Sequence, residues 1–436
     1  MPSRSSRPRF HRALARDALP LLLLLAVAPI AAGQPPDARE APRADTAGTD
    51  VTCKPVETRP PNAAEQKPEF PDQTRACAAP SNVAHELTVL ATGLEHPWAV
   101  EPLPGGDLLV TERPGRMRIV RADGTVGEPI AGLPAVDARG QGGLLDVALG
   151  PDFATDRTLY WSYSEPRDGG NATSVARGVL SEDGARLEQV RVILRTEPVY
   201  DGDKHFGSRL LFGPDGMLYV TLGERSDKPM RPQAQQLDSH LGKLLRVTPE
   251  GAAPPDNPFV GREGARPEIW TLGHRNVQAA AFDAAGQLWV VEHGTNGGDE
   301  LNRIEKGKNY GWPLVAYGEE YSGEPIEGAE TTRPGYEPPV YYWDPVIAPS
   351  GAQFYRGDAF PDWQGDLFVG GLRALALVRL ELENGRVVGE EHLLGDRQRR
   401  VRDVREGPDG ALYVVTDEAD GQLWRIAPPA PSAAGR

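Results

Sequence analysis

The sequence predicts an all-β protein, a six-bladed β-propeller. Glycine (49 residues) and proline (42) are abundant in a chain of 436 residues, and so many turn-forming residues argue against a helical bundle. From about residue 86 one unit recurs: an apolar strand, a turn with Pro, Asp or Gly, and a second apolar strand. The turns with their second strands lie at 104–112, 151–165, 213–224, 283–294, 361–371 and 407–418.

These units predict six blades closed into a ring. The shortest intervals between turns are close to the ~40–50 residues of a four-stranded blade, and longer intervals indicate loop insertions. Asp-Gly turns between β-rich runs are hairpin signals, and crossover helices are not evident. An array of β-sandwiches is the alternative, but irregular spacing with repeated turn chemistry favours a closed ring.

Residues 1–33 have the three parts of a secretory signal. Five arginines and one acid precede a short apolar run, which ends in small residues up to Gly33. The run is short and contains Pro29, so an uncleaved membrane anchor is the less favoured alternative. We therefore expect a periplasmic or secreted protein without stable membrane insertion.

Residues 34–84 are a Pro- and Ala-rich arm that precedes the propeller domain, 85–428, and a short tail, 429–436. The arm has little apolar periodicity, which is typical of a linker or a loosely ordered segment. It contains both cysteines, Cys53 and Cys77, and an exported protein most often pairs two such cysteines in a disulfide. Free thiols or a metal pair are the alternatives, and no neighbouring CxxC or His supports a metal.

The composition limits the partners of the chain. Charged residues make up 25% and hydrophobic residues 39%, which is typical of a globular protein. The formal net charge is −15, whereas nucleic-acid binding requires a basic face. We therefore expect no nucleic-acid partner.

Polar residues gather at one point of the repeat, the start of the strand that precedes each turn. In a propeller this strand lines the channel, so equivalent positions of different blades converge at one mouth. A set of ordinary polar residues at a solvated rim is the alternative for any one of them. The residues concerned are Gln141, His205, Arg275 with Asn276, and Arg400 with Arg402, while a fifth unit has the segment 349–354.

Several arginines of this acidic chain are predicted to lie at that mouth. Arg275, Arg400 and Arg402, with Arg373, would be costly to bury without anions. A polycarboxylate or phosphate ligand would satisfy them through bidentate contacts. A structural ion pair with Asp403 is the alternative for Arg402.

Two further features suggest a base and a cation site. His205 is the best candidate for a general base, because neutral imidazole accepts a proton near neutral pH. The loop 292–304 is rich in carboxylate and amide oxygens, the ligands that Ca²⁺ prefers, although a Gly/Asn turn explains it equally well. The tripeptide 171–173 matches a glycosylation acceptor, a pattern that often arises by chance.

The motifs QGGLLDVALGPDF, HFGSRLLFGPDG, TLGHRNVQAAAF, EHGTNGGDELNRI, KNYGWP and RVRDV occur in this order within about residues 87–427. This set resembles the soluble quinoprotein sugar dehydrogenases. In particular it resembles the bacterial aldose sugar dehydrogenases, which use pyrroloquinoline quinone (PQQ) and calcium. The family fold, a six-bladed propeller, agrees with the six units above.

The resemblance implies specific roles. His205 matches the base that takes the proton of the anomeric hydroxyl, while Arg275 and Asn276 match the pair that contacts the quinone oxygens. The other implied cofactor contacts are Gln141, Arg373, Arg400 and Arg402. The implied calcium ligands are the carbonyl oxygens of Gly294 and Thr295 for one ion, and positions Glu300 and Tyr310 for a second.

The implied function is oxidation of aldose sugars at the anomeric carbon to lactones, with electrons passed from PQQ to an external acceptor. Lys204 replaces an acid before the base and is expected to lower the pKa of His205. The dimer-forming insertions of the glucose enzyme are not evident, so a monomer is expected. The alternatives are a calcium-dependent lactonase or esterase on the same fold, and a non-catalytic extracellular binding propeller.

Overall fold

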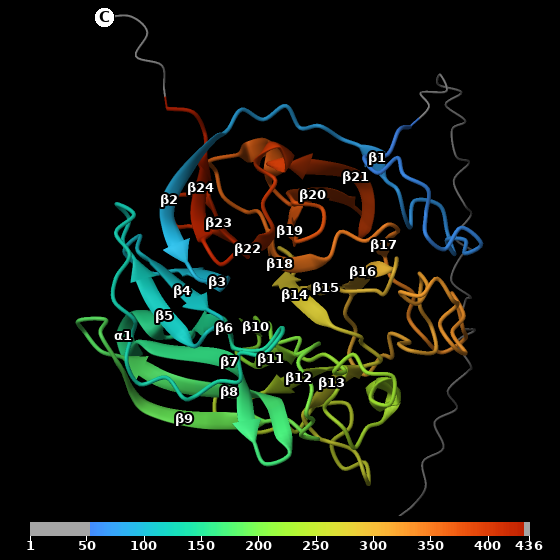
Figure 1. The fold of residues 1–436 in the computed structure, drawn as a ribbon, viewed down its shortest axis with the longest axis horizontal. Helices are drawn as coiled ribbons and strands as arrows, with labels where there is room; N and C mark the ends of the chain where they lie inside the picture. The colour runs from blue at the N-terminus through green and yellow to red at the C-terminus, as the bar shows by residue number, and fades with distance from the viewer. Residues whose placement is uncertain (1–52, 431–436) are drawn as a thin grey trace, which may run out of the picture. The chain divides into compact units, whose positions relative to one another are not determined.

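The computed structural model describes residues 53–430, which form six β-sheets arranged around a central channel (Figure 1). The predicted signal segment, residues 1–33, lies outside the described residues, as does most of the predicted tail. The six-bladed propeller predicted from the sequence is confirmed. The second strand of each predicted unit is the second strand of a blade, for example β4 (Leu108–Glu112) and β23 (Leu412–Thr416).

The blades follow one another in chain order, and in each the first strand lies against the channel. Blade 1 contains β3 (Pro97–Pro102), β4 and β5 (Arg116–Val120), and blade 2 contains β6 (Leu144–Leu149), β7 (Thr158–Arg167), β8 (Gly170–Leu180) and β9 (Leu187–Arg195). Blade 3 contains β10 (Leu210–Phe212), β11 (Leu218–Thr221), β12 (Lys243–Val247) and β13 (Ile269–Leu272). Blade 4 contains β14 (Val277–Phe282), β15 (Leu288–Glu292), β16 (Asp299–Arg303) and β17 (Tyr341–Trp343), and blade 5 contains β18 (Pro349–Phe354), β19 (Leu367–Gly371), β20 (Ala376–Glu383) and β21 (Arg386–Leu393). Blade 6 contains β22 (Val401–Glu406), β23 and β24 (Gly421–Ala427).

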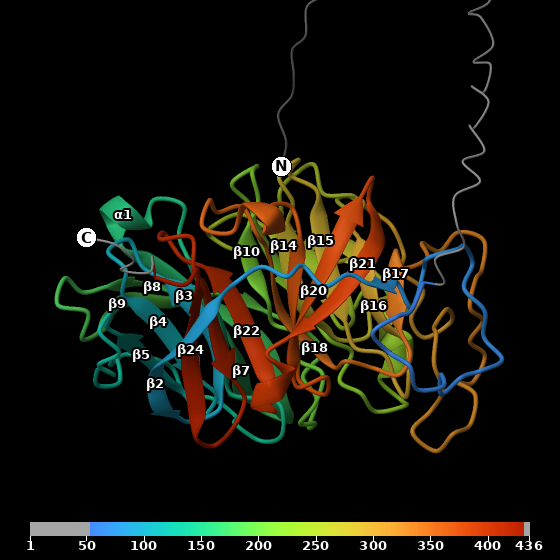
Figure 2. The same ribbon diagram turned by 90° about the horizontal axis from the view of Figure 1, so that it is seen from above.

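The ring is closed by a strand from the other end of the chain. β2 (Glu86–Leu94) pairs antiparallel with β24, with Leu87 opposite Ile426, and so completes blade 6. The two strands lie side by side in both views (Figures 1 and 2). Closure holds the two ends of the propeller together and fixes the distance between blades that face each other across the channel.

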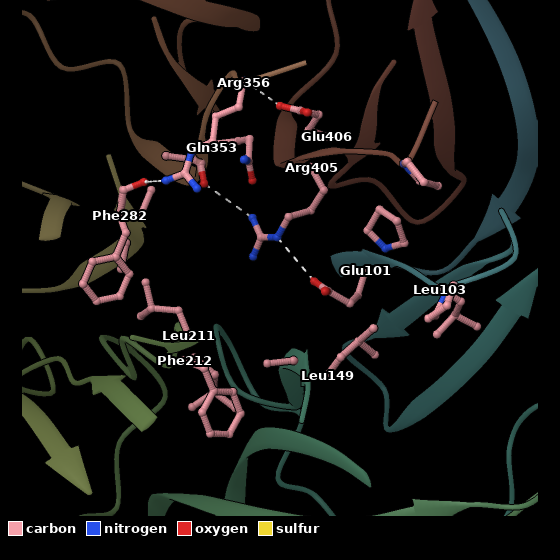
Figure 3. Close-up of a pocket in the computed structure, with 18 residues that line it drawn as sticks. Glu101, Leu103, Leu149, Leu211, Phe212, Phe282, Gln353, Arg356, Arg405 and Glu406 are labelled. Carbon is pink, nitrogen blue, oxygen red and sulfur yellow. Dashed lines mark hydrogen bonds and ion pairs between the residues drawn. The ribbon is translucent and has the colours of Figure 1, made fainter. Parts of the chain in front are cut away.

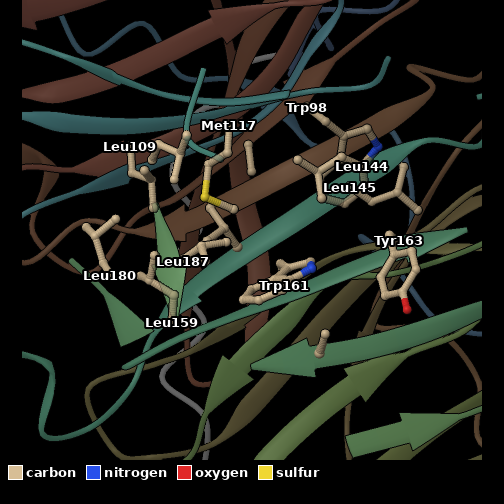
Figure 4. Packing of buried hydrophobic residues seen from close by; sticks show 14 of the residues in the cluster. Trp98, Leu109, Met117, Leu144, Leu145, Leu159, Trp161, Tyr163, Leu180 and Leu187 are labelled. Atoms are coloured by element: carbon tan, nitrogen blue, oxygen red, sulfur yellow. The ribbon is translucent and has the colours of Figure 1, made fainter. Parts of the chain in front are cut away.

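Apolar side chains fill the spaces between neighbouring blades. Trp98, Met117, Leu144 and Trp161 belong to the cluster between blades 1 and 2, and each is at most 3% exposed (Figure 4). Burial of one such side chain contributes roughly 1.5–3 kcal/mol. Within residues 53–430, helix is limited to α1 (Phe153–Asp156) and three short 3₁₀ turns at Arg231–Gln235, Pro361–Trp363 and Gly395–Arg397. No helix in the described part of the chain is long and apolar enough to span a membrane.

The arm is bound to blades 4 and 5 over the part that the structure describes, 53–84. Cys53 and Cys77 form the predicted disulfide, with a Cα–Cα distance of 5.3 Å. β1 (Cys77–Ala78) pairs in parallel with the outer strand β21. Gln73 is fully buried and donates to the carbonyl of Pro339 at 2.8 Å. The composition of the arm suggests a loose linker, but these long-range contacts hold it on the outer edges of two blades.

Candidate active site

The channel has a cavity at each end. Residues at the starts of first strands line one cavity, for example Trp98 and Arg402, and residues at their ends line the other, for example Pro102 and Glu406. The cavity at the starts, here called the polar cavity, has a volume of about 340 Å³. Four of the predicted residues line it: Gln141, Asn276, Arg400 and Arg402. The sequence prediction of convergence at one mouth is therefore confirmed for these four residues. His205 and Arg275 do not line the cavity, and Gln353 of the segment 349–354 lines the cavity at the other mouth.

The cavity at the opposite mouth is larger, about 520 Å³, and contains none of the predicted site residues. Leu149, Leu211 and Phe282 line one side of it, whereas Gln353, Arg405 and Glu101 line the other (Figure 3). By volume alone, this cavity would be chosen over the polar cavity as the candidate active site. The residues predicted to bind a ligand, however, lie at the other mouth.

A network of buried ion pairs lies between the two cavities. Arg209 contacts Asp146 at 2.7 Å and Asp403 at 3.3 Å, and Arg405 contacts Asp403 at 3.0 Å. Arg209 also lies 4.5 Å from the ring of Trp98, which lines the polar cavity. The side chains of Arg209, Asp146 and Asp403 are at most 1% exposed. Together they form a plug, a layer of buried charged side chains that separates the two cavities.

His205 lies beside the polar cavity in a conformation set by its neighbours. Its φ is 50°, and its backbone N–H donates to Oε1 of Gln141 at 2.8 Å. Nδ1 lies 2.9 Å from Oε2 of Glu224, and both side chains are buried. Strained backbone of this kind is costly and is concentrated at functional sites.

Burial lowers the pKa of His205 below its ordinary value, the ion pair with Glu224 opposes this effect, and Arg275 adds to it. Burial alone would raise the pKa of Glu224, but the interactions with His205 and Arg275 lower it. Glu224 is thus a carboxylate that accepts the Nδ1 proton of a neutral imidazole, which leaves Nε2 as the proton acceptor. Lys204 is exposed, and it is burial that lowers the pKa of the base.

Arg275 and Asn276 connect blades 3 and 4 beside the base. The backbone N–H of Arg275 donates to Glu292 at 2.6 Å, and its guanidinium lies 5.1 Å from the ring of Trp312. Nε of Arg275 is buried without a partner among the described residues. Asn276 accepts a hydrogen bond from the backbone of Gly207 at 3.1 Å, next to His205. Arg275 therefore retains an unsatisfied donor beside the base.

Arg400 and Arg402 share one carboxylate on the opposite side of the channel. Arg402 donates to Asp417 and, at 3.1 Å, to Gln278, while Arg400 lies 3.5 Å from Asp417. The ion pair of Arg402 with Asp403 that was considered as an alternative does not form. Successive side chains of a strand point to opposite faces, so Asp403 points away from Arg402 toward the plug.

Arg373 is a predicted cofactor residue that lies outside the polar cavity and contacts none of the residues described above. Its side chain is exposed and does not line the polar cavity, whereas the preceding residue, Leu372, does. Its backbone N–H donates to Ile347 at 2.9 Å.

Four residues of the site were missed by the sequence analysis: Arg113, Glu224, His293 and Asp417. Arg113, His293 and Asp417 line the polar cavity, and Glu224 contacts the base. Each lies one to three residues after the second strand of a blade. Antiparallel pairing places the end of that strand beside the start of the first, as Val277 opposite Glu292 shows. The positions directly after each second strand could therefore have been predicted to lie at the same mouth as the starts of the first strands.

The predicted calcium loop contains carboxyl groups whose negative charge is not balanced by neighbouring cationic side chains. Burial raises the pKa of Asp299 to about 7, although its carboxylate accepts the backbone N–H groups of Gly294 and Ala348, each at 2.8 Å. Burial and the neighbouring Glu292 raise the pKa of Glu300 well above its ordinary value.

A partly satisfied amide bridges two of these acids. Nδ2 of Asn302 lies 3.1 Å from both Glu292 and Glu300, and its Oδ1 is buried without a partner in the described chain. Residues 53–430 contain no cluster of three or more His, Cys, Asp or Glu side chains arranged for a metal ion. The hydroxyl of Tyr310 donates to the carbonyl of Arg303 and accepts the backbone N–H of Glu305. The orphan amide oxygen and the uncompensated carboxyls fit a hard cation, which takes oxygen ligands including carbonyls.

The possible glycosylation acceptor is not accessible. Asn171 is fully buried, its amide donates to Asp137 and Gly202, and its oxygen accepts from Arg225 at 2.6 Å. Arg225, which donates to this side chain, also donates to the carbonyl of Lys204, the residue before His205. The tripeptide match is therefore a chance pattern.

Fold and site together define a class of protein: a six-bladed β-propeller in which a buried histidine, paired with a carboxylate, lies beside a channel mouth lined by arginines. Residues 94–425 match the family model of glucose / sorbosone dehydrogenases, so the chain belongs to this family. It is 45% identical over 355 residues to the aldose sugar dehydrogenase of Escherichia coli, covering 80% of this chain and 94% of that protein. It is 28% identical over 410 residues to quinoprotein glucose dehydrogenase B of Acinetobacter calcoaceticus, covering 76% and 85%.

A solved structure extends this likeness. The PQQ-bound aldose sugar dehydrogenase of Streptomyces coelicolor superposes with a TM-score of 0.65 at 31% identity, over 79% of this chain and 99% of the other. The resemblance seen in the sequence motifs and the prediction of an oxidoreductase of this family are confirmed.

Proposed function

We propose that the protein is a PQQ-dependent dehydrogenase that oxidises aldose sugars at the anomeric carbon to lactones. One observation carries the proposal. Gln141, which accepts the backbone N–H of His205, and Asn276, which follows Arg275, line the same cavity of about 340 Å³ as Arg113, Arg400 and Arg402. A candidate proton acceptor thus lies directly beside the cavity that these arginines line.

The charges of the cavity fit a polycarboxylate. Arg113, Arg400 and Arg402 line it with a single acid, Asp417, so the set carries a net positive charge. Nε of both Arg113 and Arg402 is buried without a partner in the described chain. PQQ is a planar tricarboxylate, and carboxylates are the anions that arginines bind in bidentate geometry. Arg400, Arg402, Gln141 and Asn276 would hold it, with Arg275 near the reacting end.

The residues around His205 suit proton abstraction from a sugar hydroxyl. Nε2 of the neutral imidazole accepts the hydroxyl proton, and the carboxylate of Glu224 stabilises the imidazolium that forms. Bound PQQ supplies an ortho-quinone that takes up the hydride from the anomeric carbon. The cation of Arg275 stabilises the negative charge that develops beside it. The sugar loses one proton and one hydride and becomes the lactone.

Calcium is part of this proposal. The backbone oxygens of Gly294 and Thr295 are the proposed ligands of a cofactor-associated ion. A second ion is proposed at the positions of Glu300 and Tyr310, and the raised pKa of Glu300 and the orphan oxygen of Asn302 support a missing cation there.

Export, a monomeric state and an external electron acceptor complete the proposal. The Arg-rich start and apolar run of residues 1–33 support export, and the predicted extracytoplasmic location is consistent with the Cys53–Cys77 disulfide. A lactonase is less well supported, because the acids at the channel centre, Asp146 and Asp403, are occupied by arginines.

The test is reconstitution of the purified protein. Glucose should reduce a redox dye only when PQQ and Ca²⁺ are both supplied, and EDTA treatment before loading should prevent activity. The lactone should be detected as the product. Absence of PQQ binding and of dye reduction with a panel of aldoses would overturn the proposal, and lactone hydrolysis with Ca²⁺ alone would favour the lactonase.

A further inference from the structure

Arg113 is a guanidinium in the wall of the polar cavity that lacks an anion. It directly follows β4, and Nη1 donates to the carbonyl of Gly140 at 2.5 Å. Nε is buried without a partner, and no residue of the described chain accepts a hydrogen bond from Nη2. Two of its three nitrogens therefore have free donors, one of them in the cavity wall, and a carboxylate would satisfy such a pair.

The surroundings of Arg113 are rich in positive charge. Arg113 forms no ion pair within residues 53–430, and the nearby acid Asp417 already contacts Arg402, Arg400 and His96. Burial lowers the pKa of Arg113, Asp417 opposes this, and Arg402 and Arg400 add to the lowering. A purely structural arginine would be expected to have its own carboxylate. Three guanidiniums with one acid instead indicate room for an added anion.

Hydrogen bonds also link Arg113 to the segment that holds His205. Gly140, which it binds, precedes Gln141, and Gln141 accepts the backbone N–H of His205 at 2.8 Å. The backbone oxygen of Arg113 accepts the N–H of Leu144 at 3.0 Å, which fixes the other end of this loop. An anion bound by Arg113 would therefore lie against the loop that positions the base.

We propose that Arg113 binds a carboxylate of the cofactor, as a third arginine beside Arg400 and Arg402 contributed by blade 1. This inference rests on the proposed function. None of the predicted cofactor residues belongs to blade 1, so Arg113 adds a contact from a further blade. The anion site would then include residues of both the first and the last blade of the ring.

The first test is titration of the full-length apoprotein with PQQ in excess Ca²⁺, followed by calorimetry. Arg113→Gln should raise the Kd about 10- to 100-fold, as expected for loss of a hydrogen bond to a charged group. The affinity of this variant should also depend less on salt concentration, since one charge contact is missing. Arg121→Gln is the matched control: it removes one exposed arginine of the same blade, paired with Asp107, and should leave the Kd unchanged.

A second measurement needs no variant. Phenylglyoxal should modify Arg113 of the wild-type apoprotein, and PQQ with Ca²⁺ should protect it, as followed by peptide mass spectrometry. Arg121 should react equally in both states. If Arg113 reacts at the same rate with and without PQQ, or not at all, the inference is wrong even where Arg113→Gln is unstable.

The two proposals fail in different ways. If the wild type does not bind PQQ, the proposed function fails. If the wild type binds PQQ but a folded Arg113→Gln variant binds within twofold of it, only the role of Arg113 fails.

Discussion

Oε2 of Glu224 lies 2.9 Å from Nδ1 of His205, although the two residues are 19 positions apart and belong to different turns of blade 3. Oε2 also accepts the backbone N–H of Ser226, while Oε1 is buried without a partner in the described chain. This carboxylate fixes the tautomer of the imidazole and so determines which nitrogen can accept a proton.

Replacement of His205 should separate catalysis from binding. His205→Ala should lower kcat by about 10²–10⁴-fold, the usual contribution of a general base. The affinity for PQQ should change little, because the arginines that meet its carboxylates are intact. Stopped-flow reduction of the bound cofactor by glucose measures the first effect, and titration measures the second. Reduction at the wild-type rate would mean that another group is the base.

Glu224→Gln should also lower kcat, by a smaller factor than His205→Ala. The amide keeps the shape of the side chain but cannot stabilise the imidazolium. KM should change little, since Glu224 does not line the cavity. Glu197→Gln, at a more exposed site outside the pocket, is the control, and equal kcat values for the two variants would contradict the role of Glu224.

The pH dependence follows from the lowered pKa of His205. The neutral form is the base, so activity should be full above this pKa and should fall as the pH decreases through it. The acid limb of kcat/KM should therefore lie below the ordinary histidine value of about 6.5. Glu224→Gln should move the limb to still lower pH, because the carboxylate raises the pKa of His205. A shift toward higher pH would be incompatible with the ion pair.

Arg402→Ala should weaken binding of PQQ by about 1.5–3 kcal/mol. Arg400 shares Asp417 with Arg402 and can compensate in part, so the double variant with Arg400→Ala should bind more weakly than either single variant. Fluorescence titration in Ca²⁺ measures both. Unchanged affinity in the double variant would exclude the arginine set as the cofactor site.

The disulfide should stabilise the protein without a role in chemistry. It closes a loop with a sequence separation of 24, and loss of such a crosslink costs about 3 kcal/mol in the chain-entropy description. Cys53→Ser with Cys77→Ser should lower Tm while kcat is retained, because the arm contacts the outer strands of blades 4 and 5. A large loss of kcat in the folded variant would show that the arm supports the site.

The sequence by itself determined the six blades, the disulfide and four of the polar residues that line the cavity. Hairpin turns and alternating strands are local features, so their repetition predicts the blades, and equivalent positions such as Gln141 and Arg402 can be assigned to one mouth. The attachment of the arm could not be predicted in this way. Gln73 is held by contacts with residues more than 200 positions away, and its own segment carries no apolar period.

Only the tertiary structure decided which charges meet. Arg402 pairs with Asp417, not with its neighbour Asp403, because adjacent side chains of a strand face opposite ways and antiparallel pairing brings the end of β23 beside the start of β22. Arg113 joins these residues only because ring closure places blade 1 next to blade 6. Such contacts depend on strand register and closure of the whole ring, which no local stretch of the sequence specifies.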